Sequence, residues 1–163
     1  MDNERPTLTI SDSSLHAMLC QSSKQTGIML YDATQHTDLV EEVRKIVAAT
    51  GQAVTVIDAR TLTDKTILRS QLEQVPDGYV VFTHITRIPQ GEDREMIANM
   101  VRWCLKGDYR QASANTSFGS DWQDHLAQVA PGMIAIIPDE DDNTPLHNRI
   151  CNGSIGANIR ITN

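Results

Sequence analysis

The chain alternates between short apolar runs and longer segments in which apolar residues recur every three or four positions. Short apolar runs between turn residues are typical of buried strands, and the wider spacing is typical of helices with one buried face. The runs predict strands at 28–31, 53–58, 79–83, 133–137 and 158–162. The periodic segments predict helices at 13–23, 37–51, 63–75, 96–107 and 120–129, with one or two helical turns within 144–152.

Strands and helices follow one another in strict succession, which is typical of parallel strands joined by right-handed crossovers. We therefore expect a single α/β domain, a three-layer sandwich with a mostly parallel five-stranded sheet of P-loop NTPase-like or Rossmann-like type. Residues 1–25 form an N-terminal extension with one helix, and residues 26–162 form the five-strand core. Such sheets carry their functional groups in the loops at the carboxyl ends of the strands.

The composition and charge of the chain argue against several kinds of partner. The 163 residues are 40% hydrophobic, which suits one core, and 14 Lys and Arg against 21 Asp and Glu give a net charge of −7. This balance argues against a nucleic-acid partner, because binding to the phosphate backbone depends on cations. The chain has no apolar run of the ~20 residues that cross a bilayer, and an odd number of cysteines argues against a disulfide framework. We expect a cytoplasmic protein with reduced thiols and no membrane partner.

Two stretches resemble a known family. The run YVVFTHITRIP at 79–89, followed by REMIANMVRWCLKG at 94–107, is similar to the Walker B strand and the following helix of AAA+ ATPases. In that family the strand ends in an Asp-Glu pair. The resemblance puts Thr83 in the place of the Asp that binds magnesium and His84 in the place of the Glu that activates water.

The run GMIAIIPDEDDNTPLHNRI at 132–150 is similar to the AAA+ sensor strand and to the short helix that ends in an arginine finger. Arg149 takes the place of the finger, which would reach a neighbouring subunit. The sensor Asn or Thr is missing from Ile134 to Ile137. The resemblance covers residues 26–162 and implies a degenerate AAA+ core that lacks the Walker residues.

The loop after the first core strand bears on nucleotide hydrolysis. A P-loop there would read G-x-x-x-x-G-K-[ST], but this chain reads DATQHTD from Asp32 to Asp38, with no glycine and with Asp38 in place of the lysine. At ~4 Å and an effective dielectric constant of about 20, that reversal of sign costs several kcal/mol against a triphosphate. We therefore predict no ATP or GTP hydrolysis, no cofactor and no catalytic residue. A simpler interpretation is that Thr37 and Asp38 cap the next helix.

Polar residues at the predicted strand ends form a second candidate site. An imidazole beside a carboxylate can perform general acid-base catalysis, and polar residues at such a rim can also simply bond the loops. The residues of this candidate rim cleft are Asp32, His36, Asp38, Asp58, Thr83 and His84.

Two other groups of residues are weaker candidates for a functional site. Two His-x-x-x-Cys pairs, His16 with Cys20 and His147 with Cys151, could hold zinc only if all four residues met, and the chain has no C-x-x-C, so we predict no metal site. The acidic run at 139–142 is expected to face solvent.

A protein-interaction role has its own candidate residues. The polar segment from Gly107 to Ser120 carries Tyr109, Arg110 and Phe118, and we expect it to bind a partner together with Arg149. The leading hypothesis is a noncatalytic AAA+-like interaction or regulatory module, whose partner is another protein or a second copy.

Two alternatives stay open. One is a small flavodoxin-like enzyme or ligand-binding protein that uses His36 and His84, and the other is a nucleic-acid accessory factor, which the net charge opposes. A polar cleft that joins the two histidines would favour the first alternative, whereas a flat rim and an exposed apolar patch would favour the interaction module.

Overall fold

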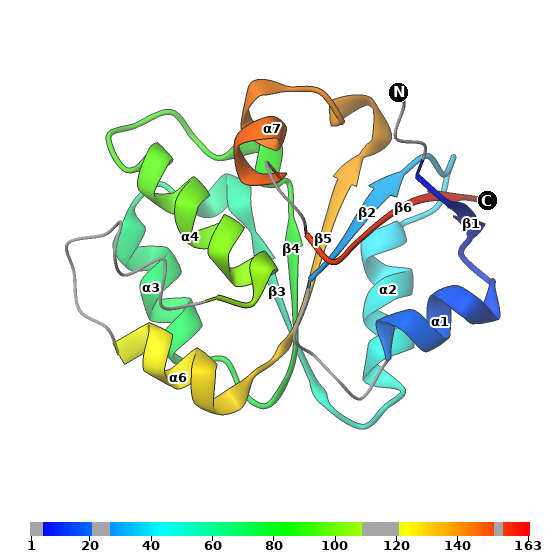
Figure 1. Ribbon diagram of the computed structural model, residues 1–163, viewed down its shortest axis with the longest axis horizontal. Coiled ribbons are helices and arrows are strands. Elements are labelled where there is room, and N and C mark those ends of the chain that lie inside the picture. The colour runs from blue at the N-terminus through cyan, green and yellow to red at the C-terminus, as the bar shows by residue number, and fades with distance from the viewer. Residues whose placement is uncertain (1–4, 21–26, 109–120, 152–154) are drawn as a thin grey trace.

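A computed structural model describes residues 5–20, 27–108, 121–151 and 155–163. These residues form one sheet of six parallel strands in the order β1-β6-β2-β5-β4-β3 (Figure 1). The strands are β1 (Thr7–Thr9), β2 (Ile28–Asp32), β3 (Ala53–Asp58), β4 (Gly78–Thr83), β5 (Gly132–Pro138) and β6 (Ala157–Thr162).

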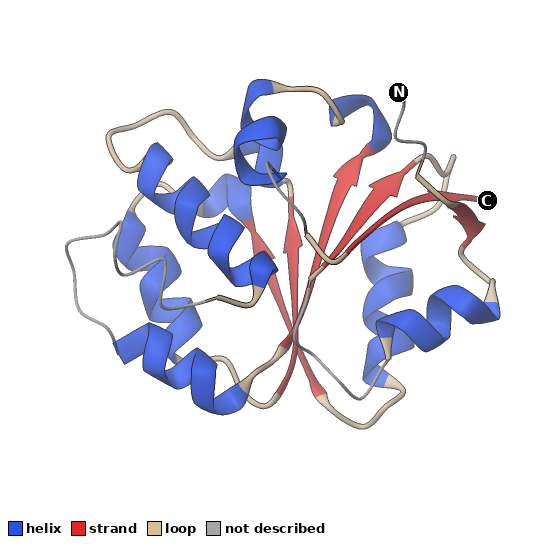
Figure 2. Ribbon diagram, in the orientation of Figure 1, coloured by secondary structure: helices blue, strands red, loops and turns tan. Residues whose placement is uncertain are grey.

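Helices cover both faces of the sheet, with α1 and α2 on one side and α3, α4, α6 and α7 on the other (Figure 2). They are α1 (Ser13–Leu19), α2 (Leu39–Ala48), α3 (Lys65–Glu73), α4 (Arg94–Lys106), α6 (Asp121–Val129) and α7 (Pro145–Cys151), with short 3-10 turns η1 (Ala59–Thr61), η2 (Ile85–Arg87) and η3 (Asp139–Asp141). None of the helices in the described ranges combines the length and apolar character that crossing a membrane requires.

The α/β class and the parallel sheet are confirmed, but the predicted count of five strands was one too few, because the sheet has six strands. The extra strand is β1, in which Leu8 pairs with Ile161 of β6. A segment of three residues with a single apolar side chain gives no periodic signal. It forms a strand because β6 offers the backbone hydrogen bonds that the segment cannot provide for itself.

The core has one apolar cluster on each face of the sheet, and β2 contributes to both. Met29 and Tyr31 face α4 and α6, whereas Ile28 and Leu30 face α1 and α2. All four side chains are buried, as their continuous apolar run predicted for a strand covered on both faces.

Local capping explains where several helices begin. The carboxylate of Asp12 accepts the Ser14 N–H at 2.8 Å at the start of α1. Asp64 caps α3, because its carboxylate accepts both the backbone N–H and the hydroxyl of Thr66, so the helix begins at Lys65 and not at the predicted position 63.

Gly78 marks a position where the sheet tolerates no side chain. Its φ is +153°, and a Cβ atom there would lie 2.1 Å from the carbonyl oxygen of Ala53 on the neighbouring strand. We expect Gly78→Ala to lower the free energy of unfolding by about 2–3 kcal/mol, because the β3–β4 pairing must shift to admit the methyl group. Urea unfolding measures the change. Gly91→Ala is the matched control, since a Cβ atom there meets nothing within 4 Å, and an equal loss in both variants would contradict the prediction.

Candidate functional site

The carboxyl ends of the parallel strands meet along one rim of the sheet, and the polar side chains that follow them fall into two groups. The first group follows β3 and β4. Arg60 holds the carboxylate of Asp58 from two directions, with its Nη2 at 2.8 Å from Oδ2 and its Nε at 3.1 Å from Oδ1. Nδ1 of His84 lies 3.3 Å from Oδ1 of the same carboxylate and 3.2 Å from the hydroxyl of the buried Thr83.

The first group is therefore a compact charge network. Hydrogen bonds from Arg60 hold the pKa of Asp58 below its usual range, although partial burial opposes the shift. A carboxylate that is already neutralised by a guanidinium is a weak base for catalysis. His84 itself adopts a left-handed backbone conformation, with a φ of +56°.

The second group follows β2 and contains Asp32, His36 and Asp38. The carboxylate of Asp32 accepts the N–H and the hydroxyl of Thr34, which closes the start of the loop on itself. His36 is exposed and has a φ of +62°. Asp38 accepts the Glu41 N–H at 3.2 Å and caps α2, as the simpler interpretation expected.

The two groups lie on opposite sides of β5. Asn163, at the end of β6, exchanges two hydrogen bonds with the backbone of Gln35, so the loop that carries His36 leans toward β6. His84 leans the other way, toward Asp58 on β3. The structure thus brings Asp58, Thr83 and His84 together and places Asp32, His36 and Asp38 elsewhere on the rim.

The acidic run after β5 differs from its prediction, because three of its four carboxylates are paired instead of facing solvent alone. Asp139 lies 3.0 Å from Nε of Arg160, and Asp142 lies 2.7 Å from Nη1 of Arg5. Asp141 is buried and accepts the Thr86 hydroxyl at 2.6 Å. The run therefore ties β6, the N-terminal segment and η2 to the end of β5. Spacing along the chain contains no information on these distant partners.

A buried polar cluster beneath α7 was missed by sequence reasoning. The Tyr31 hydroxyl lies 2.9 Å from Nε2 of His147 and donates to Oδ1 of Asn158 at 3.2 Å, while the guanidinium of Arg5 stacks 3.8 Å above the ring. Burial raises the pKa of the Tyr31 phenol to about 12 and that of the Cys151 thiol to about 11. Both groups stay protonated near neutral pH, so Cys151 is not an activated nucleophile.

The two His-x-x-x-Cys pairs lie on opposite faces of the sheet. Nε2 of His16 lies 2.9 Å from the Ile10 carbonyl, and the Cys20 thiol donates to the Ile46 carbonyl at 3.5 Å, both on the α2 side. His147 and Cys151 pack on the other side, against the cluster that includes α4. The sheet separates the four potential ligands. Within the described ranges, no group of three or more His, Cys, Asp or Glu side chains is arranged to hold a metal ion.

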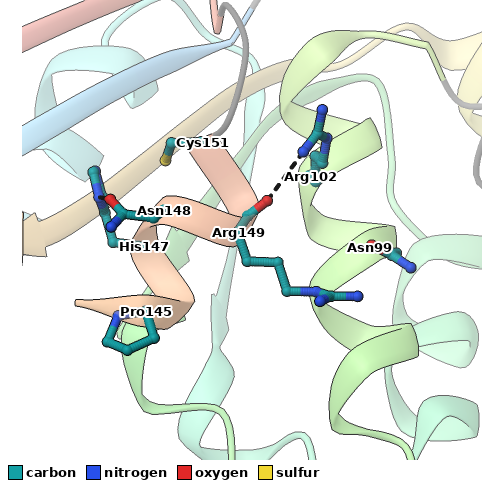
Figure 3. Close-up of a pocket in the computed structure, with 7 residues that line it drawn as sticks. All are labelled: Asn99, Arg102, Pro145, His147, Asn148, Arg149 and Cys151. Carbon is teal, nitrogen blue, oxygen red and sulfur yellow. Dashed lines mark hydrogen bonds between the residues drawn. The ribbon is translucent and has the colours of Figure 1, made fainter. Parts of the chain in front are cut away.

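A polar pocket of about 720 Å³ lies along α7 where this helix packs beside α4 (Figure 3). Its lining residues are Asn99, Arg102, Pro145, His147, Asn148, Arg149 and Cys151. Nη1 of Arg102 donates to the Arg149 carbonyl at 3.1 Å, and so binds the last turn of α7. The Arg149 side chain reaches toward α4, where its Nη2 lies 2.5 Å from Oε1 of Glu95.

Arg149 is therefore placed on the surface as the finger resemblance implied, but it pairs with a carboxylate of its own chain. The other predicted interaction residues, Tyr109, Arg110 and Phe118, lie outside the described residues.

Replacing Tyr31 tests the buried cluster. We expect Tyr31→Phe to lower the free energy of unfolding at pH 7 by about 1–2 kcal/mol, because His147 and Asn158 lose a buried partner.

The raised pKa of the Tyr31 phenol also predicts how stability depends on pH. The phenol stabilises the fold fully below its unfolded-state pKa of about 10. This stabilisation is lost as the pH rises toward the folded-state pKa of about 12. Urea unfolding at several alkaline pH values should show a smaller loss of stability for Tyr31→Phe than for the unmodified chain. Parallel losses would show that Tyr31 does not carry this pH dependence.

Replacing Arg149 tests its structural role. Its ion pair with Glu95 joins two exposed side chains, and such pairs contribute under about 1 kcal/mol. We expect Arg149→Ala to change the melting temperature by no more than a degree or two, while a role at an interface would appear as weaker assembly in sedimentation. Glu95→Ala is the control that removes the same ion pair but keeps the guanidinium. Equal effects of both variants on assembly would argue against contact between the guanidinium and a partner.

Comparisons with protein families, with curated proteins and with solved structures find no match for this chain. The AAA+ resemblance therefore depends only on the residues quoted for it. Two parts of the strand-end geometry bear on function: the closed loop after β2, and the charge network after β3 and β4.

Proposed function

We propose that this chain is a noncatalytic AAA+-like α/β module that acts by binding protein partners rather than by hydrolysing nucleotide. The observation that carries the proposal is the cap of α2. The Asp38 carboxylate occupies the helix end at which a P-loop would present free N–H groups to phosphate.

The charges around this helix end oppose phosphate binding. Glu41 and Glu42 lie in the first turn behind Asp38, so three carboxylates interact with the positive end of the helix dipole. The nearest cations along the helix, Arg44 and Lys45, form ion pairs with Glu41 and Glu42. A triphosphate placed here would meet negative charge on the side where it needs cations and N–H donors.

The end of β4 supports the same conclusion. A Walker B strand ends in carboxylates that hold magnesium and orient water, whereas β4 ends in the buried Thr83 and in His84. The nearest carboxylate, Asp58 on β3, is bound to Arg60. Among the residues that the structure describes, the carboxylate beside this strand end is thus already bound to a guanidinium instead of being open to a magnesium ion.

The strand order argues against the flavodoxin-like alternative. In β6-β2-β5-β4-β3 the first core strand lies between the last and the fourth. A flavodoxin-like sheet places its first strand between the second and the third. The separation of His36 from His84 also deprives that alternative of its catalytic pair.

Few large apolar side chains are exposed. Within the described ranges the large hydrophobic residues that stay exposed are Val56 on β3 and Ile67 on α3, with 41% and 37% of their surface accessible. They lie on different elements, and isolated apolar side chains are common on protein surfaces, so these two do not by themselves mark a binding patch.

Calorimetry with Mg-ATP and Mg-GTP tests the noncatalytic half of the proposal. We expect no heat of binding, because the α2 end offers carboxylates in place of N–H donors and lysine. Asp38→Asn is a useful companion variant, since asparagine also caps helices but carries no charge. It should fold normally and still fail to bind, because no lysine is introduced. Micromolar binding by the unmodified chain would overturn the proposal.

A further inference from the structure

The pocket along α7 is lined by cations and amides. Its described lining residues include two arginines, Arg102 and Arg149, and two asparagines, Asn99 and Asn148, but neither Asp nor Glu. The chain as a whole has a net charge of −7, so this lining differs in sign from the rest of the molecule. Guanidinium and amide N–H groups donate hydrogen bonds, and the pocket therefore favours a ligand with negatively charged acceptor oxygens.

One face of α4 carries the groups that meet α7. Glu95, Asn99 and Arg102 are four and three residues apart, so their side chains lie along the same face of the helix. Arg149 contacts both ends of this row, because its side chain reaches from α7 to Glu95 and its carbonyl accepts Nη1 of Arg102 (Figure 3). Asn99 therefore lies between the two contacts.

Two members of this row keep hydrogen-bonding capacity that the described part of the chain does not use. The side-chain amide of Asn99 forms no hydrogen bond within the described ranges. Arg102 has no carboxylate partner there, and its Nε is buried without a hydrogen bond. The Arg149 carbonyl and the Trp103 ring, whose centre lies 5.3 Å from Cζ, hold the guanidinium in place without neutralising it.

The thiol of Cys151, which also lines the pocket, reports the positive charge nearby. Burial raises the pKa of this thiol to about 11, whereas the charges of Arg5 and Arg102 act to lower it. Arg5 is paired with Asp142 at 2.7 Å. Arg102 is thus a cation at the pocket whose charge no described carboxylate balances.

We propose that the pocket between α4 and α7 binds a small organic monocarboxylate, with the carboxylate held by Arg102 and by the amide of Asn99. This inference goes beyond the proposed interaction role and does not depend on it. The volume of about 720 Å³ lies within the ~300–1,000 Å³ of ligand sites and exceeds what a carboxylate alone needs. The remaining space, beside Pro145 and Asn148, suits a neutral part with hydroxyl or amide groups.

The balance of charge favours a carboxylate over a phosphate. Arg149 is neutralised by Glu95, so Arg102 leaves the pocket with one net positive charge. One positive charge matches a monoanion. A phosphate ester carries a charge of about −1.5 to −2 at neutral pH, and it would also meet the carboxylate of Glu95.

Titration of the isotope-labelled full chain with N-acetylglycine, followed by nuclear magnetic resonance, tests the proposal. This probe has one carboxylate and one neutral amide. We expect a dissociation constant on the order of 1 mM, because so small a molecule makes few contacts. The side-chain N–H signals of Asn99 and Arg102 should shift with it. N-acetylglycinamide, in which a neutral amide replaces the carboxylate, and inorganic phosphate should each bind at least about tenfold more weakly.

Replacing Arg102 tests the source of the affinity. Arg102→Gln keeps an amide that can donate to the Arg149 carbonyl but removes the charge, so N-acetylglycine should bind at least about tenfold more weakly. Arg44→Gln is the matched control. Arg44 is also partly exposed, but it lies on α2, across the sheet from the pocket (Figure 2). This control should keep the dissociation constant within about twofold of the original value.

Replacing Glu95 gives the opposite expectation. Glu95→Gln frees Arg149 from its ion pair and adds a second positive charge at the pocket, so N-acetylglycine should bind at least about threefold more tightly. A variant that only loosened the packing of α7 on α4 would bind the probe more weakly.

Four results would overturn the site: no shift at Asn99 and Arg102, equal binding of N-acetylglycinamide or phosphate, equal effects of Arg102→Gln and Arg44→Gln, or no gain of affinity in Glu95→Gln. None of them bears on the binding of Mg-ATP or Mg-GTP. The noncatalytic proposal is therefore tested separately, by the calorimetry.

Discussion

The position of β2 is the constraint on which the rest of this structure depends. Its four apolar residues are buried on both faces, and both of its neighbours, β5 and β6, come from the last third of the chain. The core closes only when strands separated by more than a hundred residues pair. This pairing also fixes the loop after β2, the start of α2 and the buried Tyr31 cluster.

The rim of the sheet is built from charges that neutralise one another. Asp38 interacts with a helix end, Asp58 with Arg60, Asp139 with Arg160, and Asp142 with Arg5. In an enzyme of this architecture some of these positions would be left for a ligand to satisfy. Here the chain itself supplies partners for these four carboxylates, which stabilises the strand ends.

Much of the secondary structure follows from local rules that act within a few residues. The apolar runs predicted five of the strands, and Asp38 acts as a helix cap at the predicted position. β1 escaped prediction because a strand of three residues is stable only when another strand pairs with it. The acidic run at 139–142 was misjudged for a related reason, since its partners Arg5, Thr86 and Arg160 are remote in sequence.

The sequence by itself determined the α/β class, the bounds of most elements and the absence of glycine and lysine from the loop at Asp32 to Asp38, because each depends on residue types and spacing along a short stretch. Only the tertiary structure decided the order of the strands, the separation of His36 from His84 and the pairing of Arg149 with Glu95. These depend on which distant segments meet. The apolar periodicity of a strand predicts which of its faces is buried but not which strand it pairs with. For the same reason, the sequence does not show that β3 lies at an edge of the sheet.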